Sequence, residues 1–218
     1  MALSFFMALK VYEIFYSLQG ETSRMGLPTV FVRLTGCPMR CVYCDTEYAF
    51  SGGRNMEITD ILQQVASYGA RYVCVTGGEP LAQKECHALL QALCDAGYSV
   101  SLETGGAMDI SKVDSRVSVI LDVKTPASGE EKNMRWDNIN HVNAKDEIKF
   151  VICNRADYDW AKAKLAELRL ADKCPVLFSP AFHDLPAETL AAWVLEDKLP
   201  VRMQIQLHKI LWGEKQGV

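Results

Sequence analysis

The fold is decided by the stretch Gly36-Cys-Pro-Met-Arg-Cys-Val-Tyr-Cys-Asp-Thr46, which carries Cys37, Cys41 and Cys44 in one short loop. Thiolates are soft ligands that select Zn, Cu(I) or iron-sulfur clusters, and closed sites of the common kinds use four protein ligands. This loop supplies three. If the centre is a [4Fe-4S] cluster, its fourth iron therefore keeps an open position at which a small molecule can bind.

With Tyr43 directly before the last cysteine, the loop resembles the cluster loop of radical S-adenosylmethionine (SAM) enzymes. Thr76-Gly-Gly-Glu-Pro80 follows at the distance of the motif that meets the SAM amino group in that family. The resemblance implies a [4Fe-4S] cluster whose open iron is chelated by SAM. The alternative is a zinc knuckle that borrows a fourth ligand from elsewhere in the chain.

Three further stretches resemble one branch of this family, the 7-carboxy-7-deazaguanine synthases, which act on a pterin. Leu18-Gln-Gly-Glu-Thr22 resembles their Gln-Gly-Glu-Gly turn, with Thr22 in place of the second glycine. Phe31-Val-Arg-Leu34 resembles the strand that leads into their cluster loop, and Gln206-Leu-His-Lys209 resembles the end of their chain. The resemblance extends over nearly the whole sequence. His208 has no partner visible in the sequence and is interpreted as structural.

The resemblance assigns roles to individual residues, and in this branch no side chain is the catalyst, because a 5′-deoxyadenosyl radical performs the chemistry. A lone Arg or Lys is more often a solvated charge, and a Thr after a loop is more often a cap. The implied cluster ligands are Cys37, Cys41 and Cys44, and the implied Mg²⁺ ligand is Thr46. The implied SAM contacts are Tyr43, Cys44, Asp45, Gly77, Gly78, Glu79, Gly106, Lys124 and Lys149, with Glu79 as the charged partner of the amino group. The implied substrate contacts are Leu18, Gln19, Gly20, Glu21, Arg33 and Thr104.

The composition is that of a globular enzyme that acts on a small molecule. The chain has 218 residues, 49% hydrophobic and 23% charged, and a net charge of −4, so one domain over residues 1–218 is expected, with residues 1–9 as a flexible tail. The acidic balance does not favour nucleic acid or an anionic membrane as a partner. The chain has eight cysteines, three in the loop and five scattered singly, which is too few for a disulfide scaffold. A low-potential cluster also needs reducing conditions, so a cytoplasmic location is expected.

Hydrophobic periodicity predicts strands that alternate with helices, hence an α/β fold. Strands are expected at 11–16, 29–35, 72–75, 99–102, 117–122, 147–152, 176–179 and 201–206, and helices at 57–68, 81–96, 158–170 and 187–196. The segments after Gly106 and Pro126 look too irregular for crossover helices, and residues 128–146 could form a mobile loop or lid. The prediction is a partial parallel (β/α) barrel of the radical SAM type with a reduced set of helices, its site at the carboxyl ends of the strands.

The activity implied by the resemblance is conversion of 6-carboxy-5,6,7,8-tetrahydropterin to 7-carboxy-7-deazaguanine with loss of ammonia, on the route to queuosine and other 7-deazapurines. The reduced cluster would give one electron to SAM, the resulting radical would take a hydrogen from the pterin, and SAM would be re-formed. A flavodoxin-like or ferredoxin-like reductant and a homodimer are implied as well. The alternatives are another radical SAM enzyme, such as a glycyl-radical-enzyme activase, and, more remotely, a non-catalytic zinc or electron-transfer module.

Overall fold

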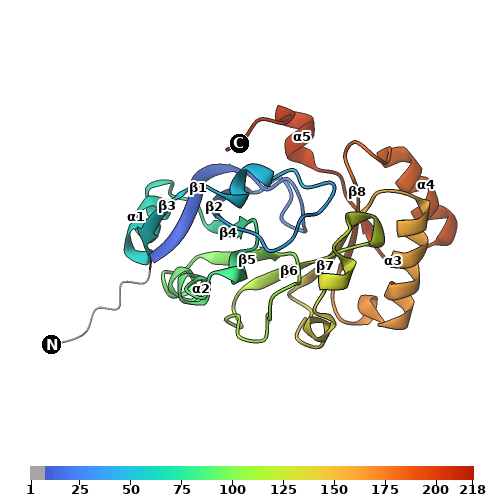
Figure 1. Ribbon diagram of the computed structural model, residues 1–218, viewed down its shortest axis with the longest axis horizontal. Helices are drawn as coiled ribbons and strands as arrows, with labels where there is room; N and C mark the ends of the chain where they lie inside the picture. Colours follow the sequence, from blue (N-terminus) through green and yellow to red (C-terminus); the bar gives the residue numbers. More distant parts are fainter. Residues whose placement is uncertain (1–7) are drawn as a thin grey trace.

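The computed structural model describes residues 8–218 (Figure 1). Residues 1–7 of the expected tail lie outside the described residues. Ala8 and Leu9, which the expected tail included, are instead the first residues of strand β1, and Leu9 is fully buried opposite Met56 of strand β3. Strand β1 therefore includes residues before the predicted start at residue 11.

Within residues 8–218, nine strands form one sheet in the order β3-β1-β2-β4-β5-β6-β7-β8-β9. Every pair from β2 to β9 is parallel, whereas β1 runs antiparallel to both β2 and β3. The predicted partial parallel barrel is confirmed. The strands are β1 Ala8–Leu18, β2 Pro28–Leu34, β3 Arg54–Glu57, β4 Tyr72–Gly77, β5 Ser99–Thr104, β6 Ser118–Val123, β7 Glu147–Ile152, β8 Val176–Pro180 and β9 Arg202–Met203.

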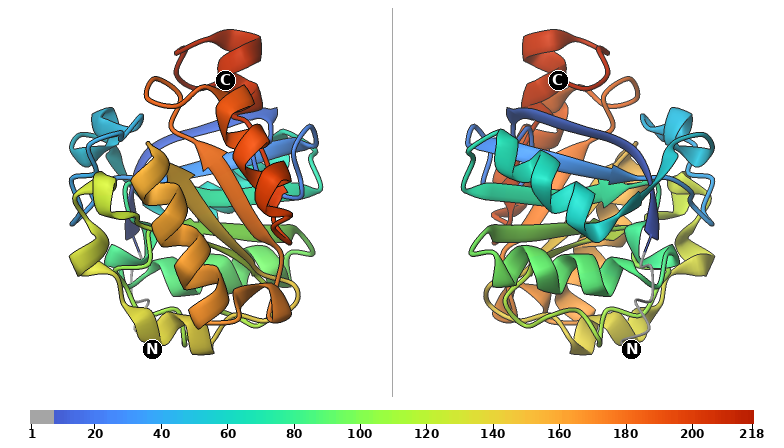
Figure 2. Two further views of the ribbon diagram at one scale, coloured as in Figure 1. Left: turned by 90° about the vertical axis from the view of Figure 1, so that its right-hand side faces the viewer. Right: turned by 90° about the vertical axis from the view of Figure 1, so that its left-hand side faces the viewer.

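The helices cover the two flanks of the curved sheet unevenly. Figure 2 shows α3 and α4 together on one flank and α1 and α2 on the opposite one, while α5 lies apart beside the carboxyl terminus. Apolar side chains of the first four helices pack into the same core as the strands. No helix in the described part of the chain is both long and apolar enough to cross a bilayer. The helices are α1 Ile58–Ser67, α2 Cys86–Asp95, α3 Arg155–Glu167, α4 Ala187–Asp197 and α5 Leu207–Trp212.

Between β5 and β7 the expected shortage of helices is confirmed. After β6 the chain forms three short 3₁₀ helices, Pro126–Ser128, Glu131–Asn133 and Trp136–Asn140. Met134, Ile139 and Val142 are buried in the core, so this segment covers the sheet where a crossover helix is missing. The expectation of a lid at residues 128–146 is therefore wrong.

Several element boundaries differ from the predicted ones, among them those of β1, which extends over Ala8–Leu18, and α3, which extends over Arg155–Glu167. Helix α2 begins at Cys86 rather than at residue 81, since Pro80–Ala82 forms a 3₁₀ turn whose Leu81 N–H is bound by the Glu79 carboxylate at 3.0 Å. Strand β9 ends at Met203 rather than at residue 206. Strand β3 and helix α5 are not predicted, because neither short stretch has a clear apolar period.

The turn between β1 and β2, residues 19–27, closes the amino-terminal end of the barrel. The Ser23 N–H donates to the Glu147 carboxylate at 3.1 Å, and the Arg24 guanidinium donates to the carbonyl of Ser99 at 3.1 Å. Glu147 and Ser99 are the first residues of β7 and β5. The turn is thereby fixed beneath the parallel strands, with its other side chains available to the barrel interior.

Thr22 adopts a left-handed backbone conformation, with φ of 69°. That conformation is unfavourable for a β-branched residue. Thr22 stands at the position of the second glycine in the Gln-Gly-Glu-Gly turn of the synthases. The Thr22 hydroxyl accepts the Arg24 N–H at 3.1 Å, and the Thr22 N–H donates to Gln204 Oε1 at 2.9 Å. The backbone shape of the turn is thus kept, and its strain is offset by two local hydrogen bonds.

Candidate active site

A cavity of about 500 Å³ opens at the carboxyl ends of the parallel strands. Its wall contains residues from the β1–β2 turn, the cysteine loop, strands β2 and β4 to β7, helix α5 and residues 213–218. All predicted site residues line it except Glu79 and Gly106. Those in the wall are Leu18, Gln19, Gly20, Glu21, Arg33, Cys37, Cys41, Tyr43, Cys44, Asp45, Thr46, Gly77, Gly78, Thr104, Lys124 and Lys149.

Glycines allow the turn after β4 to lie directly against the cysteine loop. A Cβ atom on Gly78 would lie 2.3 Å from the carbonyl oxygen of Gly36 and 2.8 Å from Cβ of Cys37. A Cβ atom on Gly105, after β5, would lie 2.0 Å from Cε of Met39 in the same loop. The loop therefore lies against two strand ends. At Gly78 the contact is with backbone and permits no larger residue, whereas at Gly105 it is with the flexible end of the Met39 side chain.

The three thiols of the loop fit a group that needs three thiolate ligands. Burial raises the pKa of the Cys37 and Cys44 thiols. Burial also raises the pKa of Cys41, to about 11, and the nearby Cys44 and Cys37 add to that rise. A bound cationic centre would reverse that rise.

Within residues 8–218, no three His, Cys, Asp or Glu side chains surround one point as the ligands of a single metal ion do. In an iron-sulfur cluster each thiolate binds a different iron, so its ligands need not converge on one point. The three thiols of the loop are compatible with a cluster of that kind. No other cysteine among the described residues lines the cavity, so the loop supplies three thiolates and no fourth.

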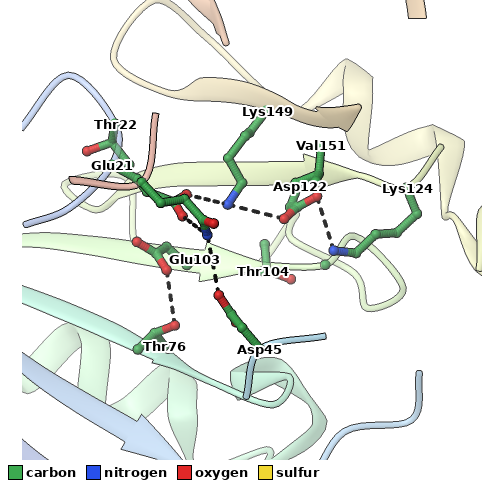
Figure 3. Close-up of polar contacts among 12 residues, drawn as sticks. Glu21, Thr22, Asp45, Thr76, Glu103, Thr104, Asp122, Lys124, Lys149 and Val151 are labelled. Atoms are coloured by element: carbon green, nitrogen blue, oxygen red, sulfur yellow. Dashed lines mark hydrogen bonds and ion pairs between the residues drawn. The ribbon is translucent and has the colours of Figure 1, made fainter. Parts of the chain in front are cut away.

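Polar side chains on adjacent strands form one layer inside the barrel (Figure 3). Arg33 lies beside Thr76 in the β2–β4 register, and Asp122 lies beside Lys149 in the β6–β7 register. Glu103 of β5 lies between them and accepts the Thr76 hydroxyl at 3.1 Å. Because side chains on a strand alternate, the register of the parallel strands brings these residues to the same level of the cavity.

A buried ion network joins two lysines to two carboxylates at this level. Lys149 Nζ lies 2.7 Å from Glu21 Oε2 and 3.3 Å from Asp122 Oδ2, and Lys124 Nζ lies 3.1 Å from Asp122 Oδ1 (Figure 3). Burial alone would lower the pKa of both lysines, but the carboxylates outweigh it and raise the pKa of each. The pKa values of Glu21 and Asp122 are lowered, since the ammonium groups outweigh burial. All four groups are therefore charged at neutral pH.

Glu79 lies beneath the cavity rather than in its wall, and its contact with the SAM amino group stays a prediction. Its side chain is fully buried and accepts the N–H groups of Leu81 at 3.0 Å and Gly105 at 2.8 Å. The Thr104 hydroxyl lies 2.9 Å from both carboxylate oxygens. Burial raises the pKa of Glu79, and these hydrogen bonds oppose the rise. Glu79 thus joins the turn after β4 to the end of β5.

Gly106 also lies outside the cavity wall. Its φ is 77°, and a Cβ atom there would lie 2.7 Å from Cε of Met134. The positive φ and this close packing against the segment that follows β6 both favour glycine, and the SAM contact of Gly106 stays a prediction.

Two predicted residues in the wall are already paired with protein groups. Arg33 Nε donates to Glu13 Oε1 at 2.8 Å. The Asp45 carboxylate accepts the Thr46 hydroxyl at 2.8 Å and lies 3.2 Å from Lys209 Nζ. Burial would raise the pKa of Asp45, but Lys209 and the Thr46 hydroxyl lower it to about 2. Asp45 thus links the cysteine loop to helix α5.

Sequence reasoning missed several residues in the wall, among them Glu103, Asp122, Gln206 and Lys209. Glu103 and Asp122 stand near the ends of β5 and β6, close to the predicted site residues Thr104 and Lys124. Their position at the strand ends could have identified them as residues of the cavity wall. Gln206 donates to Glu21 Oε1 at 2.9 Å, a contact across 185 positions that no local pattern reveals.

His208 has a packing role that the sequence did not reveal. A Cβ atom on Gly20 would lie 2.1 Å from His208 Nδ1, and the Leu207 N–H donates to the carbonyl of Gly20 at 3.0 Å. Gly20 does not have a positive φ. The glycine is therefore needed for close approach rather than for backbone freedom.

Comparison with known proteins gives consistent matches. A family model described as the radical SAM superfamily matches residues 31–172. The 7-carboxy-7-deazaguanine synthase of Chlorobaculum tepidum is 47% identical over 208 residues, which cover 94% of each chain. That of Koribacter versatilis is 42% identical over 226 residues, which cover 96% of this chain and 100% of the relative. The crystal structure of QueE from Escherichia coli has the same fold, with a TM-score of 0.77 at 24% identity over 93% of this chain and 95% of that chain.

Proposed function

The chain belongs to the 7-carboxy-7-deazaguanine synthase family of radical SAM enzymes, and from this premise we propose that it converts 6-carboxy-5,6,7,8-tetrahydropterin to 7-carboxy-7-deazaguanine with loss of ammonia. One observation carries the proposal. The same cavity is lined by the three cysteines and by polar residues from three other elements: Gln19 and Glu21 of the β1–β2 turn, Arg33 of β2 and Thr104 of β5. A polar lining of that size suits a small polar molecule held beside the cluster.

Cys37, Cys41 and Cys44 would hold the [4Fe-4S] cluster, and SAM would lie beside it against the cavity wall to which the glycines at 77 and 78 contribute. When bound, the cluster and SAM supply the one-electron chemistry that protein side chains cannot provide. The chain's own task is to bind, orient and enclose.

The charges inside the cavity are suited to orienting polar ligands. Lys124 and Lys149 keep their protons at neutral pH, because the carboxylates of Asp122 and Glu21 hold their pKa values high. Lys149 is flanked by two carboxylates and Lys124 pairs with one. Lys124 is therefore the better candidate for a ligand carboxylate, either of SAM or of the substrate.

The carboxyl-terminal segment would exclude water from the reacting centre. Residues 213–218 line the cavity. Helix α5 is attached to the opposite wall by the Lys209 ammonium, which lies 3.2 Å from Asp45, and by Gln206, which donates to Glu21. Such a cover suits an enzyme that must protect a reactive intermediate from solvent.

Mg²⁺ is proposed as a further cofactor, with Thr46 as its protein ligand. The Thr46 hydroxyl lines the cavity and lies 2.8 Å from Asp45 Oδ1. Mg²⁺ usually keeps several waters and shares an oxygen with the substrate, so one hydroxyl is compatible with such a site. A carboxylate of the pterin would complete the coordination.

We propose that the protein works in the cytoplasm as a homodimer and receives electrons from a flavodoxin-like or ferredoxin-like protein. All eight cysteines are free, which is consistent with a reducing compartment. Exposed Val42, inside the cysteine loop, lies near the position of the cluster and is compatible with an approach by a redox partner.

Anaerobic reconstitution with iron and sulfide, followed by incubation with dithionite, SAM and the carboxytetrahydropterin, tests the proposal. A Mg²⁺-dependent deazaguanine product is expected. A glycyl-radical-enzyme activase would form 5′-deoxyadenosine without that product. A zinc or electron-transfer module would do neither, and it would not bind SAM.

A further inference from the structure

We propose that Glu130 is a positioning residue that acts through the backbone of Arg40 to hold the cysteine loop and to lower the reduction potential of its cluster. The inference rests on the proposed function, because it requires a [4Fe-4S] cluster on the three loop cysteines. Glu130 belongs to none of the motifs that identified the loop, and it lies outside the cavity wall.

The segment after β6 is bonded to the cysteine loop at two points. The Arg40 N–H donates to Glu130 Oε1 at 2.9 Å, and the Val42 N–H donates to the carbonyl of Ser128 at 3.1 Å. Arg40 and Val42 stand on either side of Cys41, the middle cysteine of the loop. The backbone N–H groups on both sides of this cysteine are therefore occupied by oxygen atoms of the segment.

Glu130 is itself held in place for this contact. It is 9% exposed, its Oε2 accepts the side-chain amide of Asn133, and its N–H donates to the Ser128 hydroxyl at 3.1 Å. That hydroxyl donates to the carbonyl of Thr125 at 2.6 Å, and Thr125 directly follows Lys124 of the cavity wall. The segment that carries Lys124 into the cavity thus also fixes the Glu130 carboxylate against the loop.

The negative charge of Glu130 has no cationic partner of its own. Among residues 8–218 no lysine, arginine or histidine forms an ion pair with it, and the Arg40 N–H and the Asn133 amide are neutral donors. The Arg40 guanidinium instead donates to the carbonyls of Cys37 at 2.8 Å and Met39 at 2.6 Å. The hydrogen bond from Asn133 lowers the pKa of Glu130, so the carboxylate is charged at neutral pH.

A fixed negative charge beside an iron-sulfur cluster disfavours its reduced form, which carries one more electron. The potentials of such clusters depend on net charge, on hydrogen bonds to sulfur and on solvent exposure. Glu130 affects the first two, because it adds a negative charge and occupies an N–H that could otherwise donate to a cluster sulfur. Both effects lower the potential. A low potential is what the one-electron reduction of a sulfonium such as SAM requires.

Anaerobic potentiometry of the reconstituted protein, without SAM or substrate, tests the proposal. The reduced cluster is quantified by electron paramagnetic resonance at a series of fixed potentials, in wild type and in Glu130→Gln, whose amide oxygen can still accept the Arg40 N–H. At the wild-type midpoint, the ratio of reduced to oxidised cluster in Glu130→Gln should be about three- to tenfold higher. That ratio corresponds to a shift of about 30–60 mV to higher potential.

Two further variants separate the charge from the contact. Glu130→Asp keeps the charge but has a shorter reach, so its ratio should stay within about twofold of wild type, while a chelator should remove its iron at least about threefold faster. Glu130→Ala should show both the higher potential and the faster loss of iron. Glu131→Gln is the matched control, because the Glu131 side chain is more exposed and is not bonded to the loop in the described part of the chain. It should stay close to wild type in both measurements.

If Glu130→Gln has the wild-type potential, the assignment is wrong and the proposed function is unaffected. If that variant does not fold or does not keep a cluster, Glu130→Asp and Glu130→Ala decide, since equal potentials in these two overturn the proposal. A wild-type protein that holds no reducible cluster would refute the proposed function itself, and the inference with it.

Discussion

Asp122→Asn tests whether one carboxylate holds the two lysines of the cavity in place. The substitution keeps the size of the side chain and removes its charge. Within the described residues, Lys124 would lose its only carboxylate partner, whereas Lys149 would keep Glu21 at 2.7 Å. We expect a substantial loss of folding stability.

The burial of the ion pair determines how much folding stability Asp122→Asn should lose. Removing one partner of a buried ion pair costs about 3–5 kcal/mol. The side chains of Asp122 and Lys124 are 16% and 9% exposed, so water can replace the lost partner only poorly. Because Lys149 retains Glu21, we expect the lower end, about 3 kcal/mol. For a chain of this length that corresponds to a decrease in Tm of about 6–12 °C.

The stability difference between wild type and Asp122→Asn should decrease as the pH is lowered. The lysines lower the pKa of Asp122 in the folded state, so its contribution is present above the unfolded pKa of about 3.9 and is lost as the pH falls below it. The difference between wild type and Asp122→Asn should therefore be full at neutral pH and should shrink in acid.

Urea unfolding of the cofactor-free protein under anaerobic conditions, followed by tryptophan fluorescence, measures the change. Asp159→Asn is the control, since Asp159 forms an exposed pair with Arg155 on α3 and should lose less than about 0.5 kcal/mol. The reasoning is refuted if Asp122→Asn unfolds at the same urea concentration as the control, or if its difference from wild type stays constant down to about pH 3.5.

Three further substitutions have distinct expected outcomes. Cys41→Ser should abolish cluster absorbance and turnover, whereas Cys94→Ser on α2 should lower stability by about 1 kcal/mol and keep specific activity; equal loss in both folded proteins would contradict the cluster assignment. Thr46→Ala should weaken the response of the rate to Mg²⁺, and an unaltered Mg²⁺ titration would count against this ligand. Gly20→Ala would place a methyl group 2.1 Å from His208 Nδ1, so α5 should be displaced and cleaved faster in limited proteolysis; wild-type cleavage would show that the helix tolerates the change.

The cluster loop could be predicted because its ligands are local. The three ligands Cys37, Cys41 and Cys44 lie within eight consecutive positions, so no long-range contact is needed to bring them together. The parallel order of the sheet was also accessible, since apolar strands recur between helical periods. The short strand β3, which pairs along the edge of the sheet, has no such signal.

The ion network could not be predicted in the same way. Asp122 meets Lys149 only through the register of β6 and β7, and Glu21 meets Lys149 across 128 positions. The motif that contains Glu79 was interpreted as a contact for the SAM amino group. It did not indicate that the carboxylate points into the protein, because a sequence motif specifies neighbouring residues and not the direction of each side chain.

The cavity depends on contacts between the two ends of the chain, and this has a consequence for folding. The Thr22 N–H bonds to Gln204 across 182 positions, and Gln206 bonds to Glu21 across 185. Closing loops of that length carries the largest entropic cost in the topology and slows folding. A nascent or partly unfolded chain would therefore have a complete cysteine loop before it had a chamber to shield it. Loading the cluster before the last segment docks would expose it to oxidation, so biogenesis of the active enzyme should favour chain completion first.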